Sequence, residues 1–284
     1  MIIDAHHHLW DPGDRPYPWM EASVAAIARP FRDADLRDAL AGAVTAGTTV
    51  SGTVVVQAAH DIGETRWLLD REPPVLGVVG WVDLQPPDVA DVLDELHATP
   101  GRVPLVGLRH MAQNEPDPAW LARPDVVRGV GLATRAGLTM DLLVRSREAR
   151  AALALVDATP DGTFVLDHAA KPRIDVSGPG EPGFADWAAL LTAFAARPNV
   201  VCKLSGLFTE AGPDWARRPV RAHVDRILEV FGPARTLFGS DWPVSSLRMP
   251  YGAVVERTVA MLDALSPTER ADVLGGTARR AYRL

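Results

Sequence analysis

The feature that most constrains this fold is a regular alternation of short apolar runs with longer helical patterns along 284 residues. Each run is rich in β-branched residues and nearly continuous, as expected for strands covered on both faces in a parallel sheet. The expected strands are 2–6, 52–58, 75–82, 105–109, 138–144, 163–168, 200–204 and 235–239. The expected helices are 35–46, 62–71, 89–98, 124–136, 146–158, 184–196, 217–231 and 252–265.

Strands that alternate with helices form βαβ units. Eight of each match a (β/α)8 TIM-type barrel, which typically occupies about 250 residues. No Gly-x-Gly-x-x-Gly motif follows an expected strand, which argues against a dinucleotide-binding open sheet. We therefore expect an α/β chain in which residues 1–284 form a single barrel domain.

One N-terminal segment, residues 11–34, is too long and too aromatic for a plain connector. It contains four prolines together with Trp19 and Phe31. Connections of this length inside a compact fold are usually functional. We expect this segment to be a loop insertion that folds over the mouth of the barrel.

Several residues mark the expected helix ends. Asp61 and Ser146 stand where N-caps are needed, and Ser266 opens a last helix before a proline. Gly137 and Gly232 stand where helices should stop.

Composition excludes several classes of protein. The net charge is −7, whereas a nucleic-acid-binding surface normally carries a basic excess. No apolar run approaches 18 residues, and no basic-then-apolar leader begins the sequence. The single cysteine, Cys202, lies in an apolar run and is interpreted as a small buried hydrophobe. We expect a cytoplasmic protein with a small-molecule substrate and neither nucleic acid nor membrane as partner; whether it forms a homo-oligomer stays open.

The first expected strand carries the motif His6-x-His8. Alternate side chains of a strand share a face, so these imidazoles would project together, roughly 6–7 Å apart. Such a pair suits a divalent metal, and parallel barrels place their chemistry at the carboxyl ends of strands. Two plainer interpretations of the His6-His7-His8 run are a purification-tag remnant and polar residues of an ordinary turn.

Other polar residues also fall at expected strand ends, where a barrel would gather them around one mouth. Four of the eight histidines lie at such positions, and Asp241 follows the last strand. The polar and aromatic residues at these ends are His6, His8, Gln57, Trp81, Arg109, His110, Asp141, His168, Lys171, Asp241 and Trp242.

Four segments together resemble the amidohydrolase superfamily. They are Asp4-x-His6-x-His8-Leu-Trp, Gly107-Leu-Arg109-His110, Leu166-Asp-His168-Ala-Ala-Lys171-Pro and Gly239-Ser-Asp241-Trp242-Pro. More narrowly, they resemble its subgroup of sugar-acid lactonases, which includes L-fuconolactone and L-rhamnonolactone hydrolases and the pyrone-dicarboxylate lactonase. The resemblance spans the whole chain.

The resemblance implies a ligand set of His6, His8, His168 and Asp241 for one divalent ion, with zinc the expected metal. A lysine that could be carbamylated to bridge two metals is missing from the end of the fourth expected strand, where Arg109 and His110 stand. A two-metal centre is therefore not expected. Some members of the subgroup work without a metal, so metal-free catalysis stays open.

The implied activity is opening of a sugar-derived lactone, of the L-fucono- or L-rhamnono-type, to its aldonic acid in carbohydrate catabolism. Asp241 would be the general base and His168 a ligand or a donor to the carbonyl oxygen. The candidates for holding the substrate are Gln57, Trp81, Arg109, His110, Asp141, Lys171 and Trp242. Arg109 is the one arginine placed at the mouth, which favours a neutral lactone.

Alternatives stay open for both residues and function. Asp241 could cap a loop, His168 could be a buried hydrogen-bonded histidine, Arg109 could form a salt bridge, and Lys171 could be solvated. A metal-dependent decarboxylase of the same superfamily, acting on a small aromatic or unsaturated acid, is the main rival function. A barrel that only binds a ligand is the second.

Overall fold

The computed structural model describes residues 1–43, 49–98 and 101–284, and within these ranges eight parallel strands pair in sequence order. They are β1 (Ile2–His7), β2 (Val50–Val56), β3 (Val75–Gly80), β4 (Leu105–His110), β5 (Thr139–Leu142), β6 (Phe164–Leu166), β7 (Val200–Leu204) and β8 (Thr236–Phe238). Beyond β8, the Asp241 N–H donates to the His6 carbonyl (2.8 Å) and the His8 N–H donates to the Trp242 carbonyl (2.7 Å). The sheet is therefore a nearly closed barrel, as predicted.

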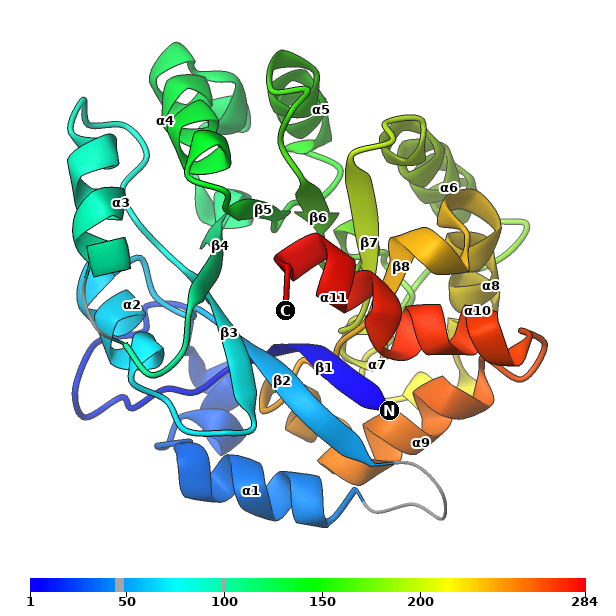
Figure 1. Cartoon of the computed structure of the whole chain (residues 1–284). Coiled ribbons are helices and arrows are strands. Elements are labelled where there is room, and N and C mark those ends of the chain that lie inside the picture. The colour runs from blue at the N-terminus through cyan, green and yellow to red at the C-terminus, as the bar shows by residue number, and fades with distance from the viewer. Residues whose placement is uncertain (44–48, 99–100) are drawn as a thin grey trace.

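Helices surround the barrel and cover the outer face of its strands (Figure 1). The outer helices are α1 (Asp33–Ala41), α2 (Ile62–Leu69), α3 (Val89–Ala98), α4 (Pro124–Arg135), α5 (Ala149–Ala158), α6 (Pro182–Ala195), α8 (Val220–Phe231) and α9 (Tyr251–Ala260). Three shorter helices complete the set: α7 (Leu207–Glu210), α10 (Pro267–Ala271) and α11 (Thr277–Tyr282). The TIM-type architecture predicted from the alternation is confirmed.

The amino end of the barrel is covered by the C-terminal helix. Figure 1 shows α11 in front of the central opening, close to the start of β1. Tyr282 of α11 is buried in one apolar cluster with Ile3, Ala5, Val54 and Leu237 from three strands. With this end filled, the carboxyl end is where a ligand can enter.

The N-terminal segment is fixed over that carboxyl end, as predicted. The Trp19 indole N–H donates to the Ala58 carbonyl (2.7 Å), and the Tyr17 hydroxyl donates to Glu64 Oε1 (2.9 Å). The Trp10 indole N–H donates to carbonyls of the same segment. A 3₁₀ helix, Ala22–Ile27, continues the segment toward α1.

Most of the expected helix signals are found. Asp61 caps α2 by accepting from the Gly63 N–H (2.8 Å), and Ser266 caps α10 in a reciprocal capping box with Glu269. Gly232 ends α8 at a φ of 71°. The prediction that Ser146 is the N-cap of α5 is wrong, because α5 begins only at Ala149.

The reason is a competing carboxylate. Glu148 accepts from the Arg145 N–H (3.0 Å) and holds the preceding residues in a turn, so α5 begins at Ala149. The helix expected over 35–46 ends at Ala41, and its last residues, 44–46, lie outside the described part of the chain.

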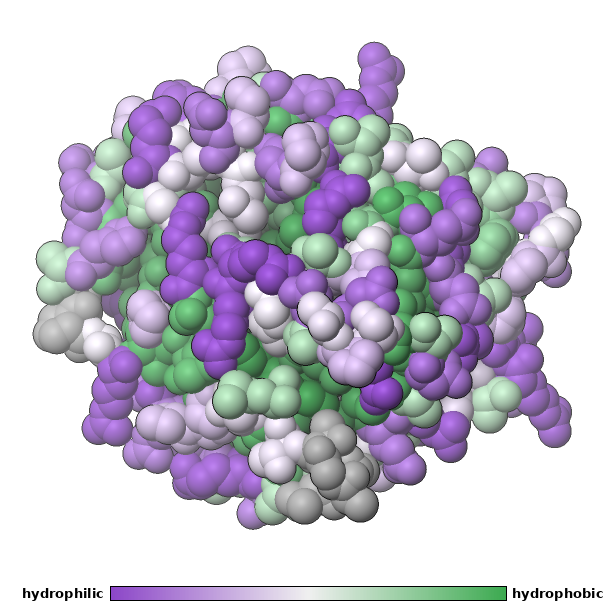
Figure 2. All heavy atoms as spheres, turned by 45° about the vertical axis from the view of Figure 1, so that its right-hand side comes forward, coloured by the Kyte–Doolittle hydropathy of each residue, from purple (hydrophilic) through white to green (hydrophobic). Residues whose placement is uncertain are grey.

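The outer face is mainly polar. Figure 2 shows hydrophilic side chains over most of the visible surface, with hydrophobic residues between them. Among the described residues, Met1 and Val176 are the large hydrophobic side chains that are exposed. No described helix has both the length and the apolar character needed to cross a bilayer.

Candidate active site

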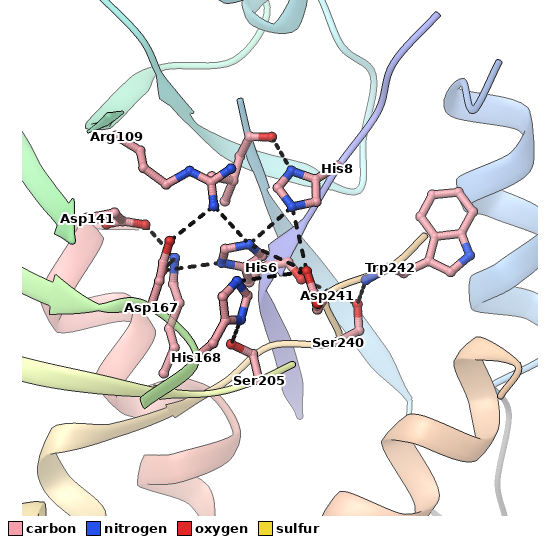
Figure 3. Close-up of polar contacts among 12 residues, drawn as sticks. His6, His8, Arg109, Asp141, Asp167, His168, Ser205, Ser240, Asp241 and Trp242 are labelled. Atoms are coloured by element: carbon pink, nitrogen blue, oxygen red, sulfur yellow. Dashed lines mark hydrogen bonds and ion pairs between the residues drawn. The ribbon is translucent and has the colours of Figure 1, made fainter. Parts of the chain in front are cut away.

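Three imidazoles converge on one carboxylate at the carboxyl end of the barrel (Figure 3). The Nε2 atoms of His6, His8 and His168 lie 3.9, 3.7 and 3.9 Å from Oδ1 of Asp241. The Nε2 atoms of His6 and His8 are 3.2 Å apart. We call these four residues the His–Asp cluster. His6 belongs to β1, His8 directly follows it, and His168 and Asp241 come from the segments after β6 and β8.

The surroundings of the outer nitrogens of His6 and His8 indicate the tautomers of both rings. His8 Nδ1 lies 2.7 Å from the Val56 carbonyl, which can only accept, so this nitrogen carries the proton. His6 Nδ1 faces Asp167 Oδ1 at 3.4 Å, and a carboxylate likewise favours N–H there. Both Nε2 atoms therefore direct lone pairs into the cluster, where they repel each other unless a cation lies between them.

This donor set fits one divalent ion. A tetrahedral ion with ligands at about 2.1 Å holds those ligands roughly 3.4 Å apart. The donor atoms of His6, His8 and Asp241 lie 3.2 to 3.9 Å from one another, and Nε2 of His168 lies 3.9 Å from Oδ1 of Asp241. Imidazole nitrogens with one carboxylate oxygen are the ligands that zinc accepts at such sites.

The protonation states also suit a cation. Burial lowers the pKa of His6, His8 and His168, that of His168 to about 4, so the rings are neutral near pH 7. Burial alone would raise the pKa of Asp241, but His168 and His8 outweigh it and the pKa is lowered. The cluster therefore offers three neutral nitrogens and one carboxylate.

A β-bulge in β1 sets the direction of the histidines. From Asp4 to His7 the strand uses three residues where β2 uses two, from Thr53 to Val55. Such an extra residue re-aims the side chains that follow it. Figure 3 shows His6 and His8 pointing toward Asp241. His7, between them in the sequence, instead contacts Thr53 Oγ1 at 3.0 Å.

His168 is presented by an unusual left-handed turn. The expected strand 163–168 ends at Leu166, and four residues from His168 to Lys171 all have positive φ, between 50° and 59°. Asp241 also has a positive φ, 58°. Each such non-glycine residue costs roughly 1–2 kcal/mol, so the surrounding structure must hold this backbone in place.

Arg109 and Asp167 lie directly beneath the cluster. Arg109 Nη1 is 3.1 Å from Asp167 Oδ2 and 3.4 Å from His6 Nε2. Its other amino group donates to the Gln57 carbonyl. The Arg109 guanidinium is thus bound by protein groups at three points while its side chain still reaches the cavity wall.

The cluster opens into a polar cavity of about 690 Å³. The sequence-predicted residues in its wall are His8, Arg109, His168, Lys171 and Asp241. Sequence reasoning missed further polar wall residues: Glu21, Ser23, Gln113, Asn114, Arg145, Thr209, Glu210 and Arg248. Because Arg145 and Arg248 line the cavity, the expectation that Arg109 is the one arginine at the mouth is wrong.

Five predicted substrate contacts lie away from this wall. Gln57 is fully buried and donates to the Arg109 carbonyl (3.0 Å), and Asp141 is fully buried against Lys203 and Tyr282. Trp242 points away from the cluster and packs edge-on against Phe31. The sequence placed these three residues at or near strand ends. In the structure, the side chains of Gln57 and Asp141 are buried against other protein groups, and that of Trp242 points away from the cluster.

Trp81 and His110, the other two, belong to a separate aromatic stack. The Trp81 indole N–H donates to His110 Nδ1 (3.1 Å), so His110 Nε2 carries the proton and donates to Glu115 (2.8 Å). His60 Nε2 accepts from the Met111 N–H (2.9 Å). Although His60, His110 and Glu115 are close enough to share an ion, the acceptor nitrogens of both histidine rings already receive protein N–H donors.

A family model and curated relatives match the chain over nearly its whole length. A model described as Amidohydrolase matches residues 3–284. An L-fucono-1,5-lactonase of Burkholderia multivorans is 36% identical over 294 residues, 99% of this chain and 96% of the relative. An L-fucono-1,5-lactonase of Burkholderia ambifaria is 38% identical over 289 residues, 99% and 95% of the two chains.

Solved structures agree with the fold. A crystal structure of an amidohydrolase from Burkholderia multivorans with bound zinc has a TM-score of 0.89 and 34% identity to this chain. The match covers 100% of this chain and 99% of that one.

Proposed function

Because the chain belongs to the amidohydrolase family, we propose that it hydrolyses a sugar-derived lactone to the corresponding aldonic acid. The observation that carries this proposal is the convergence of His6, His8, His168 and Asp241 at the floor of a polar cavity. The two lactonases, similar over nearly their whole length, support a substrate of the L-fucono-type.

We assign the metal ligands to the His–Asp cluster. His6, His8, His168 and Asp241 would hold one divalent ion, for which zinc is our candidate. When bound, this ion would polarise the lactone carbonyl and lower the pKa of water. The contacts between Asp241 and the three imidazoles all involve Oδ1, so Oδ2 is the oxygen we assign to proton transfer.

Asp241 is the proposed general base. Its lowered pKa keeps it ionised near pH 7, so it can accept a proton from the attacking water. The water oxygen forms a bond to the lactone carbonyl carbon, and the ring C–O bond breaks. Asp241 then returns its proton to the departing alkoxide, which leaves the hydroxyl group of the aldonic acid.

The substrate is held by the cavity wall. Arg109 and Lys171 are the sequence-predicted contacts that face it, and Gln113, Thr209 and Glu210 add donors and acceptors for sugar hydroxyls. Gln113 Oε1 and Thr209 Oγ1 are buried and have no hydrogen-bond partner within the described residues. A rotation of either side chain that turns this atom into the cavity would let a substrate hydroxyl satisfy it.

The test is hydrolysis of an aldonolactone panel that includes L-fucono-1,5-lactone, followed with a pH indicator. Asp241→Asn removes the base and should lower kcat/KM by about 10²–10⁴-fold. The matched control is Asp61→Asn, because asparagine also caps a helix N-terminus and Asp61 lies outside the cavity wall. Inactivity of the wild type on every lactone, with turnover of an aromatic acid, would replace this proposal by a decarboxylase.

A further inference from the structure

A lysine without solvent contact lies below the His–Asp cluster. Lys203 of β7 is fully buried, and its Nζ forms ion pairs with Asp141 and, at 2.9 Å, with Asp167 Oδ1. Both carboxylates are also fully buried. Lysine is almost never fully buried without such partners, because desolvating its charge costs several kcal/mol. The hydrolytic mechanism above assigns nothing to Lys203.

The lysine acts on the cluster through Asp167. Asp167 Oδ1 receives Lys203 and faces His6 Nδ1 at 3.4 Å, and Asp167 Oδ2 receives Arg109 at 3.1 Å. Two cations thus fix the carboxylate from both sides, and the fixed carboxylate faces the outer nitrogen of His6 (Figure 3). A shift of Asp167 would remove the acceptor that faces the outer nitrogen of His6.

The C-terminal helix fixes the other end of this chain of contacts. The Tyr282 hydroxyl lies 2.9 Å from both oxygens of Asp141 and donates to that carboxylate. Tyr282 is 1% exposed and comes from α11, which covers the amino end of the barrel. The order of contacts is therefore Tyr282, Asp141, Lys203, Asp167 and His6.

A second contact with the cluster also comes from β7. Ser205, directly after the strand, lies with its Oγ 2.8 Å from Nδ1 of His168. Lys203 and Ser205 are two residues apart, so extended backbone directs both side chains to the same face. β7 and the residue after it supply no member of the His–Asp cluster. Lys203 contacts Asp167, which faces His6, and Ser205 contacts His168 directly.

We propose that β7 is the positioning strand of the metal site: Lys203, anchored by Asp141 and Tyr282, orients His6 through Asp167, and Ser205 orients His168. This inference rests on the proposed function, because it takes the His–Asp cluster to bind a divalent ion. Outer partners of metal-binding histidines typically contribute about 10–100-fold in metal affinity.

The experiment measures zinc affinity by competition with a chromophoric chelator, alongside unfolding in urea and lactone hydrolysis. Lys203→Met and Ser205→Ala should each weaken zinc binding by about 10–100-fold. Tyr282→Phe should weaken it less, because Lys203 still holds Asp141. The matched control is Thr277→Val, which removes another buried hydroxyl hydrogen bond of α11, to the carbonyls of Pro233 and Ala234, and should leave zinc affinity unchanged.

A purely structural role predicts a different pattern. The variants would then lose stability in urea while the folded fraction bound zinc as tightly as the wild type, and this result would overturn the proposal. If Lys203→Met does not fold, the double variant Lys203→Met/Asp141→Asn, which removes one charge of each sign, and Ser205→Ala decide by the same criterion. A wild type that binds zinc and opens lactones, with these variants unaffected, refutes the positioning role alone; a wild type that binds no zinc refutes both it and the proposed metal site.

Discussion

At the scale of single residues, Gly206 shows how little room His168 has. Gly206 has a φ of 68°, and a Cβ built on it would lie 2.7 Å from His168 Nδ1. Gly206→Ala must therefore both strain the backbone, by roughly 1–2 kcal/mol, and displace the His168 ring. A misplacement of about 1 Å in an active site can cost on the order of 10²-fold in rate. We therefore expect Gly206→Ala to lower the rate of lactone hydrolysis by about that factor.

Gly232 is the matched control for this substitution. Its φ is 71°, but a Cβ there meets no atom within 4 Å. Gly232→Ala should lose at least as much stability in urea, because a φ of 71° with a ψ of 161° is a conformation that almost only glycine adopts, and should keep full kcat/KM. Equal activity of the two variants would show that His168 tolerates displacement and would count against its assigned role.

The residues of the site were predictable to different degrees. His6, His8, His168 and Asp241 stand at strand ends in a motif, and the structure brings them together. Asp167 adjoins His168 in sequence, yet nothing in the local pattern says that it turns inward toward His6. A contact such as that between Asp167 and His6 depends on which strands face each other across the barrel. The spacing of residues along one strand does not reveal which strands do so.

At the scale of elements, the left-handed turn His168–Lys171 is open to a direct test. Ala169 lies in it, fully buried, and Ala152 is equally buried in the right-handed helix α5. Ala152→Gly should cost about 2 kcal/mol of unfolding free energy, from a lost methyl and from helix propensity. Ala169→Gly loses the same methyl but relieves roughly 1–2 kcal/mol of strain, so its net change should stay within about 1 kcal/mol of zero.

Urea unfolding of both variants checks this difference. Equal destabilisation by the two substitutions would mean that the turn stores no backbone strain. The measurement is independent of activity, so it tests the local conformation rather than the chemistry.

Element boundaries were the weaker part of the sequence prediction. Apolar runs located every strand, but they did not show that β6 stops at Leu166 or that β1 bulges between Asp4 and His7. The bulge depends on pairing with β2, and the left-handed turn depends on contacts such as the bond from the Trp187 indole to the Ala169 carbonyl (2.8 Å). Both features come from tertiary contacts that local propensity does not encode.

At the scale of the whole molecule, the barrel was predictable because alternation and length leave few other architectures. Closure of the barrel matters for the site, because backbone hydrogen bonds between the His6 region and the Asp241 region join the two ends of the sheet. The C-terminal helix then fills the amino end, and the N-terminal segment covers the carboxyl end. The content of the cavity wall was less predictable, because Arg145, Glu210 and Arg248 come from segments outside the strands.

The most direct test of the proposed chemistry is a titration of metal-depleted protein with zinc, followed by elemental analysis and by hydrolysis of L-fucono-1,5-lactone. We predict that chelation abolishes hydrolysis and that activity returns in proportion to bound zinc until one ion is bound per chain, with no recovery in His6→Ala. Full hydrolysis by the zinc-free chain, or saturation at an ion number unaffected by His6→Ala, would contradict a metal centre at the His–Asp cluster.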